Sequence, residues 1–112
     1  MIELVLYDYL TEKLDVPVYT ERRNIEDDSF VLIEKTGSSE SNHVRHATFA
    51  IQSYGPSMYE AAVLNDTVHG VVADMPEIDA ISRADITGDY NYTDTTEKKY
   101  RYQMVVEIIY TE

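Results

Sequence analysis

The sequence of 112 residues contains no cysteine, few basic residues and no long apolar run. The absence of cysteine excludes a disulfide framework and thiol chemistry, and it suits a reducing compartment. No stretch approaches the roughly 18 apolar residues of a membrane-spanning helix, and the opening residues MIELVLYDYLTEKL lack the basic start of a signal peptide. We therefore predict a soluble protein that is synthesised in the cytoplasm and does not enter a membrane.

Basic residues are scarce, with nine Lys and Arg against 21 Asp and Glu, which gives a formal net charge of -12 at pH 7. A surface this acidic is repelled by phosphate backbones and by anionic lipid, so specific binding of nucleic acid or of a membrane is disfavoured. The same charge would keep DNA from adhering to a wall along which it slides.

At this length the chain is predicted to fold as one compact domain, residues 1–112, with a core that needs no metal or disulfide. Apolar residues recur at helical spacing over residues 2–14, with charged residues mostly on the opposite side. Pro17 ends this first helix, because the residue before a proline is disfavoured in the helical region.

A second helix is predicted over residues 57–75. Gly55 and Pro56 break the preceding strand, and SMYE has the pattern of a capping box, in which Ser57 caps the amide of Glu60 while Glu60 reaches back. An apolar stripe then continues to the stop at Pro76.

Five strands are predicted, over residues 16–20, 30–36, 43–55, 81–90 and 100–110. Polar stretches separate them, and 37–42 (GSSESN) is expected to be a long, mobile loop at a hairpin tip, with another projecting loop at 91–99. The order α-β-β-β-α-β-β predicts an α+β fold with a mainly antiparallel sheet of about five strands and two helices on one face.

The last strand, within EKKYRYQMVVEIIYTE (97–112), is rich in tyrosine on one of its two faces. Its residues 99–110 would span about 40 Å when extended, whereas the second helix covers only about 28 Å. We therefore expect the Tyr100–Tyr102 end to overhang the helices, with an open backbone edge that pairs with another subunit. A closed, cyclic homo-oligomer would satisfy such edges.

Candidate chemical sites in the sequence are weak. His43 and His46 lie three apart on a strand and so point to opposite faces, which argues against a metal site. The acidic clusters lack the EF-hand pattern, and no nucleophile elbow or phosphate loop is present. The tyrosines lack the basic groove that accompanies base stacking. We predict no enzymatic activity, no cofactor and no metal.

Three stretches carry a resemblance to a known family: VPVYTERRNIEDDSFVLIEKTGSSESNH, FAIQSYGPSMYEAAVLNDTV and DYNYTDTTEKKYRYQMVVEIIY. Together they resemble the tail-completion proteins of long-tailed bacteriophages and prophages, also called tail terminator or tail-to-head joining proteins. The resemblance extends from about Val16 to Tyr110. It lies in the order and lengths of the elements and in the local sequence rather than in a fixed residue motif.

The resemblance implies a structural virion protein at the head–tail junction, assembled in the cytoplasm of the bacterial host. It implies a homo-oligomeric ring, typically a hexamer, that caps the tail tube and contacts the head connector. DNA would pass through the lumen without specific binding, and neither enzymatic activity nor a cofactor is implied.

Interface residues cannot be transferred from the family, so the candidates come from the two predicted loops and the tyrosine-rich strand. They are Ser38, Ser39, Glu40, Asn42, His43, Tyr92, Lys98, Tyr100 and Tyr102. Two alternatives remain open: another neck or head-closure component of the phage, and a small ligand-binding regulatory domain that dimerises through its sheet.

Overall fold

The computed structural model describes residues 1–22, 24–97 and 99–111. Its elements follow the predicted order and confirm the α+β class. They are α1 (Ile2–Lys13), β1 (Val18–Tyr19), β2 (Phe30–Ser41), β3 (Val44–Gly55), α2 (Met58–Ala73), the 3₁₀ helix η1 (Met75–Glu77), β4 (Ile81–Asn91) and β5 (Tyr100–Tyr110).

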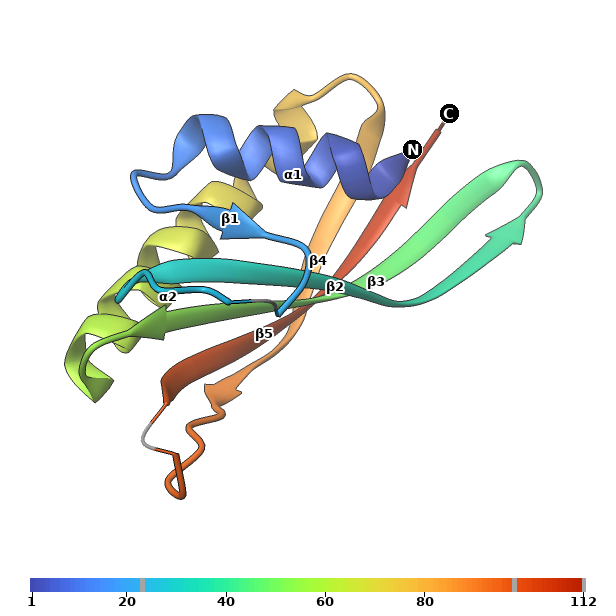
Figure 1. Ribbon diagram of the computed structural model, residues 1–112. Coiled ribbons are helices and arrows are strands. Elements are labelled where there is room, and N and C mark those ends of the chain that lie inside the picture. The colour runs from blue at the N-terminus through green and yellow to red at the C-terminus, as the bar shows by residue number, and fades with distance from the viewer. Residues whose placement is uncertain (23, 98, 112) are drawn as a thin grey trace.

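The five strands form one sheet in the order β1-β2-β3-β5-β4. The short β1 runs parallel to β2, and every other neighbouring pair is antiparallel. Both helices cover the same face of the sheet, while the β2–β3 hairpin extends beyond them (Figure 1). The protein therefore has a covered sheet face and a face without helices.

The core lies between the sheet and the two helices, because alternate residues of the central strands point toward the helices. Its fully buried side chains come from both layers, and burial of this apolar surface is the main driving force of the fold. They include Leu6 and Leu10 of α1, Val68 and Val72 of α2, Phe49 and Ile51 of β3, and Met104, Val106 and Ile108 of β5.

The two helices are joined by a partly buried hydrogen bond. The Tyr9 hydroxyl of α1 donates to the backbone oxygen of Val71 in α2 over 2.7 Å. Burial raises the pKa of Tyr9, and the nearby carboxylates of Glu77 and Asp74 raise it further, because both effects disfavour a phenolate. Tyr9 therefore stays a neutral donor that fixes the approach of α1 to α2.

The predicted cap of α2 is confirmed: Ser57 Oγ accepts a hydrogen bond from the Glu60 amide over 3.1 Å. The Glu60 carboxylate accepts from the Ser57 hydroxyl. The predicted extent to residue 75 was wrong, since α2 ends at Ala73 and the chain tightens into η1 around Pro76. A proline lacks the amide hydrogen that a continuing α-helix needs.

The prediction of a long loop at residues 37–42 was also wrong. β2 continues to Ser41, in register with β3, and only Asn42 and His43 form the turn. Both have positive φ angles, 52° and 67°, as a two-residue type I′ turn requires. The small polar side chains of this segment are typical of loops. The segment is nevertheless a strand, because its backbone groups pair with β3 in the antiparallel ladder.

The expectation of an open edge on β5 was wrong as well. β5 lies inside the sheet, paired with β3 on one side and β4 on the other. Tyr100 pairs with Gly55, at the end of the sheet where α2 begins, and residues 92–97 project beyond the helices at this end, while the β2–β3 hairpin extends beyond them at the opposite end (Figure 1). At one edge of the described sheet the two-residue β1 covers only Val31 and Leu32, so the rest of β2 is open, and the other edge is β4.

Gly70 gives a testable prediction for α2. A methyl group at this exposed helical position would meet no atom within 4 Å outside its own helix and chain neighbours. We expect Gly70→Ala to raise the free energy of unfolding by about 0.5–1 kcal/mol, because alanine loses less backbone entropy in a helix. Urea denaturation followed by circular dichroism measures the change, and a loss of stability would contradict the open space around Gly70.

Candidate assembly interface

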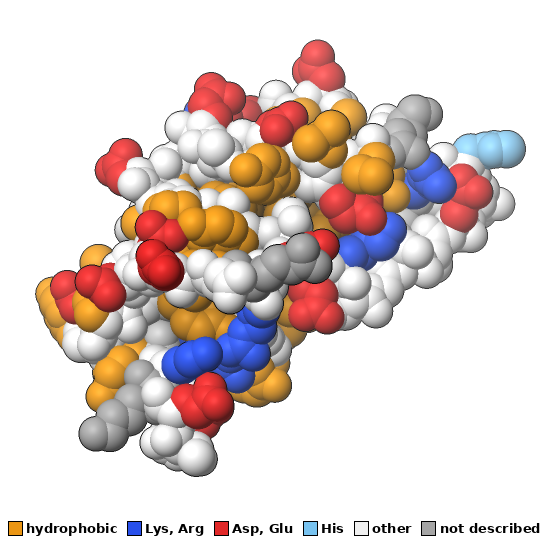
Figure 2. Space-filling model, viewed as in Figure 1, with side chains coloured by type: hydrophobic (Ala, Val, Ile, Leu, Met, Phe, Trp, Pro, Cys, Tyr) orange, Lys and Arg blue, Asp and Glu red, His pale blue; other side chains and the backbone are white. Residues whose placement is uncertain are grey.

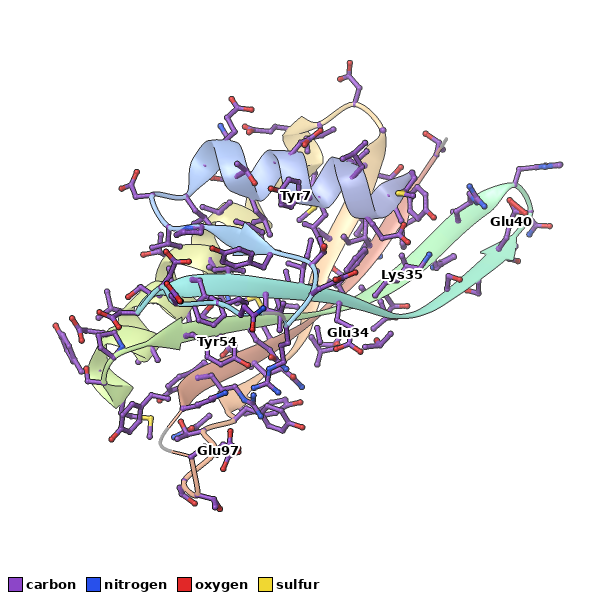
Figure 3. All side chains as sticks on the ribbon, in the orientation of Figure 1. Tyr7, Glu34, Lys35, Glu40, Tyr54 and Glu97 are labelled. Carbon is purple, nitrogen blue, oxygen red and sulfur yellow. The ribbon has the colours of Figure 1, made fainter. Side chains whose placement is uncertain are left out.

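Five of the predicted interface residues lie together at the end of the β2–β3 hairpin. Ser38, Ser39 and Glu40 belong to β2, and Asn42 and His43 form the turn. All five are exposed, and Figure 3 shows Glu40 near the tip, beyond the helices. The hairpin thus presents mainly small polar side chains on an extended backbone.

The backbone ladders of β2 with β3 and of β3 with β5 join the hairpin to the body of the sheet, and Arg45 adds side-chain contacts. Its Nε lies 3.6 Å from Glu40 Oε1, and its guanidinium group lies 5.9 Å from the centre of the Tyr110 ring. At the base, the Thr36 hydroxyl donates to the backbone oxygen of Thr48 across the two strands. These contacts make the projection a continuous arm of the sheet.

The other predicted interface residues lie at the opposite end of the sheet. Tyr100 pairs with Gly55, and Tyr102 lies between Ser53 and Asn91. Tyr92 follows β4 and is 45% exposed. Lys98 falls outside the described residues. The candidates therefore form two groups at opposite ends of a molecule 44 Å long rather than one site.

Arg101, which sequence reasoning did not select, organises the tyrosine-rich end on the face without helices. Its Nη1 donates to the Tyr54 hydroxyl and its Nε to the backbone oxygen of Tyr92, each over 2.8 Å. The guanidinium group also lies 4.7 Å from the centre of the Tyr92 ring. One side chain thus connects β3, β5 and the segment that follows β4.

Polar side chains continue this network across the same face. The Tyr54 hydroxyl donates to Gln52 Oε1, Gln52 Nε2 donates to Gln103 Oε1, and Gln103 Nε2 donates to the Tyr90 hydroxyl. The sequence signal was the alternation of Arg101 with Gln103 on the polar side of the last strand. What it did not reveal was that β3 and β4 supply partners on both sides.

Arg101→Lys is expected to lower the free energy of unfolding by about 1–2 kcal/mol, because one ammonium group cannot reproduce two directed hydrogen bonds and a ring contact. Urea denaturation measures the loss. The matched control is Arg83→Lys, since Arg83 is 66% exposed and its side chain pairs with Asp85 over 2.8 Å at the surface. We expect this control to change stability by less than about 0.5 kcal/mol. Equal losses in the two variants would contradict the special role of Arg101.

A groove of about 350 Å³ lies beside this network. Its aromatic wall is the stacked pair Phe30 and Tyr54, with ring centres 4.3 Å apart. Asp27 lines the groove and accepts a hydrogen bond from the Tyr19 hydroxyl, which raises the pKa of Tyr19. Arg22 also lines it, so both signs of charge border an aromatic surface. In Figure 2 Lys and Arg side chains gather at this end of the molecule, below a surface scattered with acids.

Within residues 1–22, 24–97 and 99–111, no three His, Asp or Glu side chains are grouped as the ligands of a metal ion. His43 and His46 both belong to the projecting hairpin. None of the helices in this described part of the chain is long and apolar enough to cross a membrane.

No protein-family model matches the chain, and no curated protein is significantly similar to it.

Proposed function

We propose that this protein is a structural component of a phage virion: a tail terminator that assembles as a ring, caps the tail tube and joins it to the head connector. The projecting β2–β3 hairpin supports this proposal most directly. It extends a paired strand beyond the helix-covered core, so its exposed residues are placed to reach a neighbouring protein. The family resemblance from about Val16 to Tyr110 points the same way.

The proposed mechanism is assembly through surfaces rather than chemistry. In a ring of identical subunits, each hairpin would contact a neighbour, the tail tube or the connector, and exposed backbone groups would gain partners on contact. The described molecule has exposed hairpin residues at one end, and the exposed Tyr92 with the partly exposed Tyr100 and Tyr102 at the other, which suits a subunit with two different partners along an axis. No catalytic step is part of this role.

The charge of the chain also supports the proposed role. A net charge of -12 places many carboxylates on the surface of each subunit, and several copies around a ring multiply that potential. DNA that passes through such a lumen would be repelled by the wall and would slide without binding. The same charge opposes ring formation, because subunits repel one another.

The solution mass of the purified protein tests the proposal. Analytical ultracentrifugation over a range of protein concentrations at low and high salt should detect a closed oligomer of a single size. High salt should favour it, since the screening length falls from about 10 Å at 0.1 M to about 3 Å at 1 M. Electron microscopy should then show rings. A monomer or dimer under every condition would contradict the proposal.

The genes on either side of the coding sequence provide an independent test. A tail terminator, or another neck component, should lie in a block that encodes a portal, connectors and a tail-tube protein. A metabolic operon around the gene would contradict both phage roles.

One observation favours a second candidate function, a small ligand-binding regulatory domain that dimerises through its sheet. The groove beside Phe30 and Tyr54 combines an aromatic wall with acidic and basic side chains, which suits a small polar ligand. A stable dimer of fixed mass, together with a metabolic gene neighbourhood, would support this candidate over the ring.

A further inference from the structure

The sheet has two open edges, and they run in opposite directions. β1 pairs only with Val31 and Leu32, so no described strand pairs with the outer side of β2 from Lys35 to Ser41. At the other edge, β4 pairs with β5 alone among the described strands. Because β2, β3, β5 and β4 are successively antiparallel, β4 of one copy meets β2 of a second copy in the antiparallel sense when the covered faces are aligned.

We infer that β4 of one subunit pairs with the outer side of β2 of the next, so that a continuous sheet passes from subunit to subunit. This inference rests on the self-association in the proposed function, and it names the contact that produces it. Pairing of β2 with β4 leaves no open edge once the ring closes, whereas pairing of two β2 edges leaves both β4 edges unsatisfied.

Irregularities in the two strands suggest the register. The β2 ladder shifts between Lys35 and Gly37, and the β4 ladder shifts between Ile86 and Gly88. Thr36 in β2 and Thr87 in β4 are the extra residues of these bulges and have no partner in the ladder. When the two bulges are aligned and these residues are skipped, Gly37 lies opposite Gly88 of the neighbour. Because glycine has no side chain, Gly37 and Gly88 leave room for the two backbones at the point where both strands bend.

The charges agree with this register. Lys35 falls opposite Asp89 of the neighbour, and both side chains lie on the helix-covered side of the sheet. Lys35 Nζ already lies 3.3 Å from Glu3 Oε2, and Figure 3 shows Lys35 and Glu34 on opposite sides of β2. The cation would then lie between two carboxylates from different subunits. Opposite charges on facing residues stabilise a strand pair, and like charges destabilise it. Because the chain is rich in acids, several other registers would place two carboxylates opposite each other, which disfavours them.

Two further pairs lie on the face without helices in the same register. Ser39 falls opposite Asp85, and Ser41 falls opposite Arg83 of the neighbouring subunit. Ser39, Ser41 and Arg83 are exposed, so substitutions there leave the core of each subunit unchanged. These positions are therefore suited to a direct test.

An apolar groove on the β1–β2 side of the molecule adds an independent reason for a neighbour there. Met1 and Leu4 of α1 are 73% and 54% exposed and line this groove together with Tyr7 and Val18. Figure 2 shows hydrophobic side chains gathered over α1 and β1. A subunit paired along β2 would lie next to this surface and cover part of it, which removes an apolar patch from water.

Engineered disulfides test the contact cleanly because the chain contains no cysteine. In the full-length double variant Ser39→Cys/Asp85→Cys, a mild oxidant should link subunits into a ladder or a closed band on non-reducing gels. Ser41→Cys/Arg83→Cys should do the same and serves as a second pair if the first variant fails to fold. The out-of-register control is Ser39→Cys/Tyr90→Cys, whose positions lie four pairing steps apart, about 13 Å along a strand. It should not cross-link, because a disulfide requires Cα atoms within about 7 Å.

The outcomes separate this inference from the proposed function. Ladders from both in-register pairs, with none from the control, support β2–β4 pairing. If Ser38→Cys alone forms a covalent dimer while neither in-register pair forms ladders, the contact is β2 with β2 and the inference fails. An oligomer by ultracentrifugation without cross-links from either pair overturns the edge contact but leaves the ring. A monomer without cross-links overturns both.

Discussion

Phe49→Ala is expected to lower the free energy of unfolding by about 3–5 kcal/mol, the largest effect of any single substitution considered for this chain. Phe49 is fully buried at the centre of β3, between β2 and β5 and beneath the helices. Removal of the ring loses its transfer free energy and leaves a cavity that the central strands cannot close. A domain of this size has only about 5–15 kcal/mol of stability in total, so a large share would be lost.

Phe30→Ala is the matched control, because it removes the same atoms from the other phenylalanine of the chain. Phe30 is half-buried on the face without helices and stacks against Tyr54. Its loss should cost about 1–2 kcal/mol, since solvent and neighbouring side chains can fill the space. Urea denaturation of both variants, monitored by circular dichroism, measures the difference. Similar losses would show that Phe49 does not occupy the centre of the core.

Gly55→Ala is expected to have the second-largest effect, a loss of about 1–3 kcal/mol. A Cβ atom at Gly55 would lie 2.6 Å from the backbone nitrogen of Ala61 and 3.0 Å from the carbonyl carbon of Glu60. Both atoms belong to the first turns of α2, so only a shift of the helix can relieve the clash. The variant should therefore unfold at lower urea concentration than the parent protein.

Gly37→Ala tests whether the effect depends on the close approach rather than on glycine itself. At Gly37 a Cβ would meet no atom within 4 Å, and its φ angle is not positive. We expect the stability of this variant to stay level or to rise by about 0.5 kcal/mol, because alanine restricts the unfolded chain. If Gly37→Ala lost as much stability as Gly55→Ala, the helix contact at Gly55 would not be the cause.

Local sequence signals predicted the elements because each depends on nearby residues. The apolar spacing of residues 2–14, the Ser57 cap and the alternation in the last strand each act within one element, and the corresponding α1, α2 and β5 are present. The order of the elements then limited the fold to helices packed on an antiparallel sheet. Helical spacing and strand alternation were thus enough to predict the elements and the fold class without tertiary information.

The candidate site was predicted less well, because its residues depend on which strands become neighbours. Five of the nine chosen residues do gather in the hairpin, since Ser38 to His43 are contiguous in the sequence. Arg101 was missed, because its partners Tyr54 and Tyr92 come from other segments. The length argument placed an open backbone edge at Tyr100, but β3 and β4 pair with β5 on its two sides, so β5 offers no such edge.

The sequence by itself determined the helices, most of the strands and the acidic surface, because these follow from local periodicity and composition. Only the tertiary structure decided that β5 lies inside the sheet, and that β4 and the part of β2 beyond the short β1 are its open edges. The physical reason is that strand order depends on contacts between residues distant in the chain, which local patterns do not encode. The candidate strands for pairing with a neighbouring subunit are therefore β2 and β4, and not the tyrosine-rich β5.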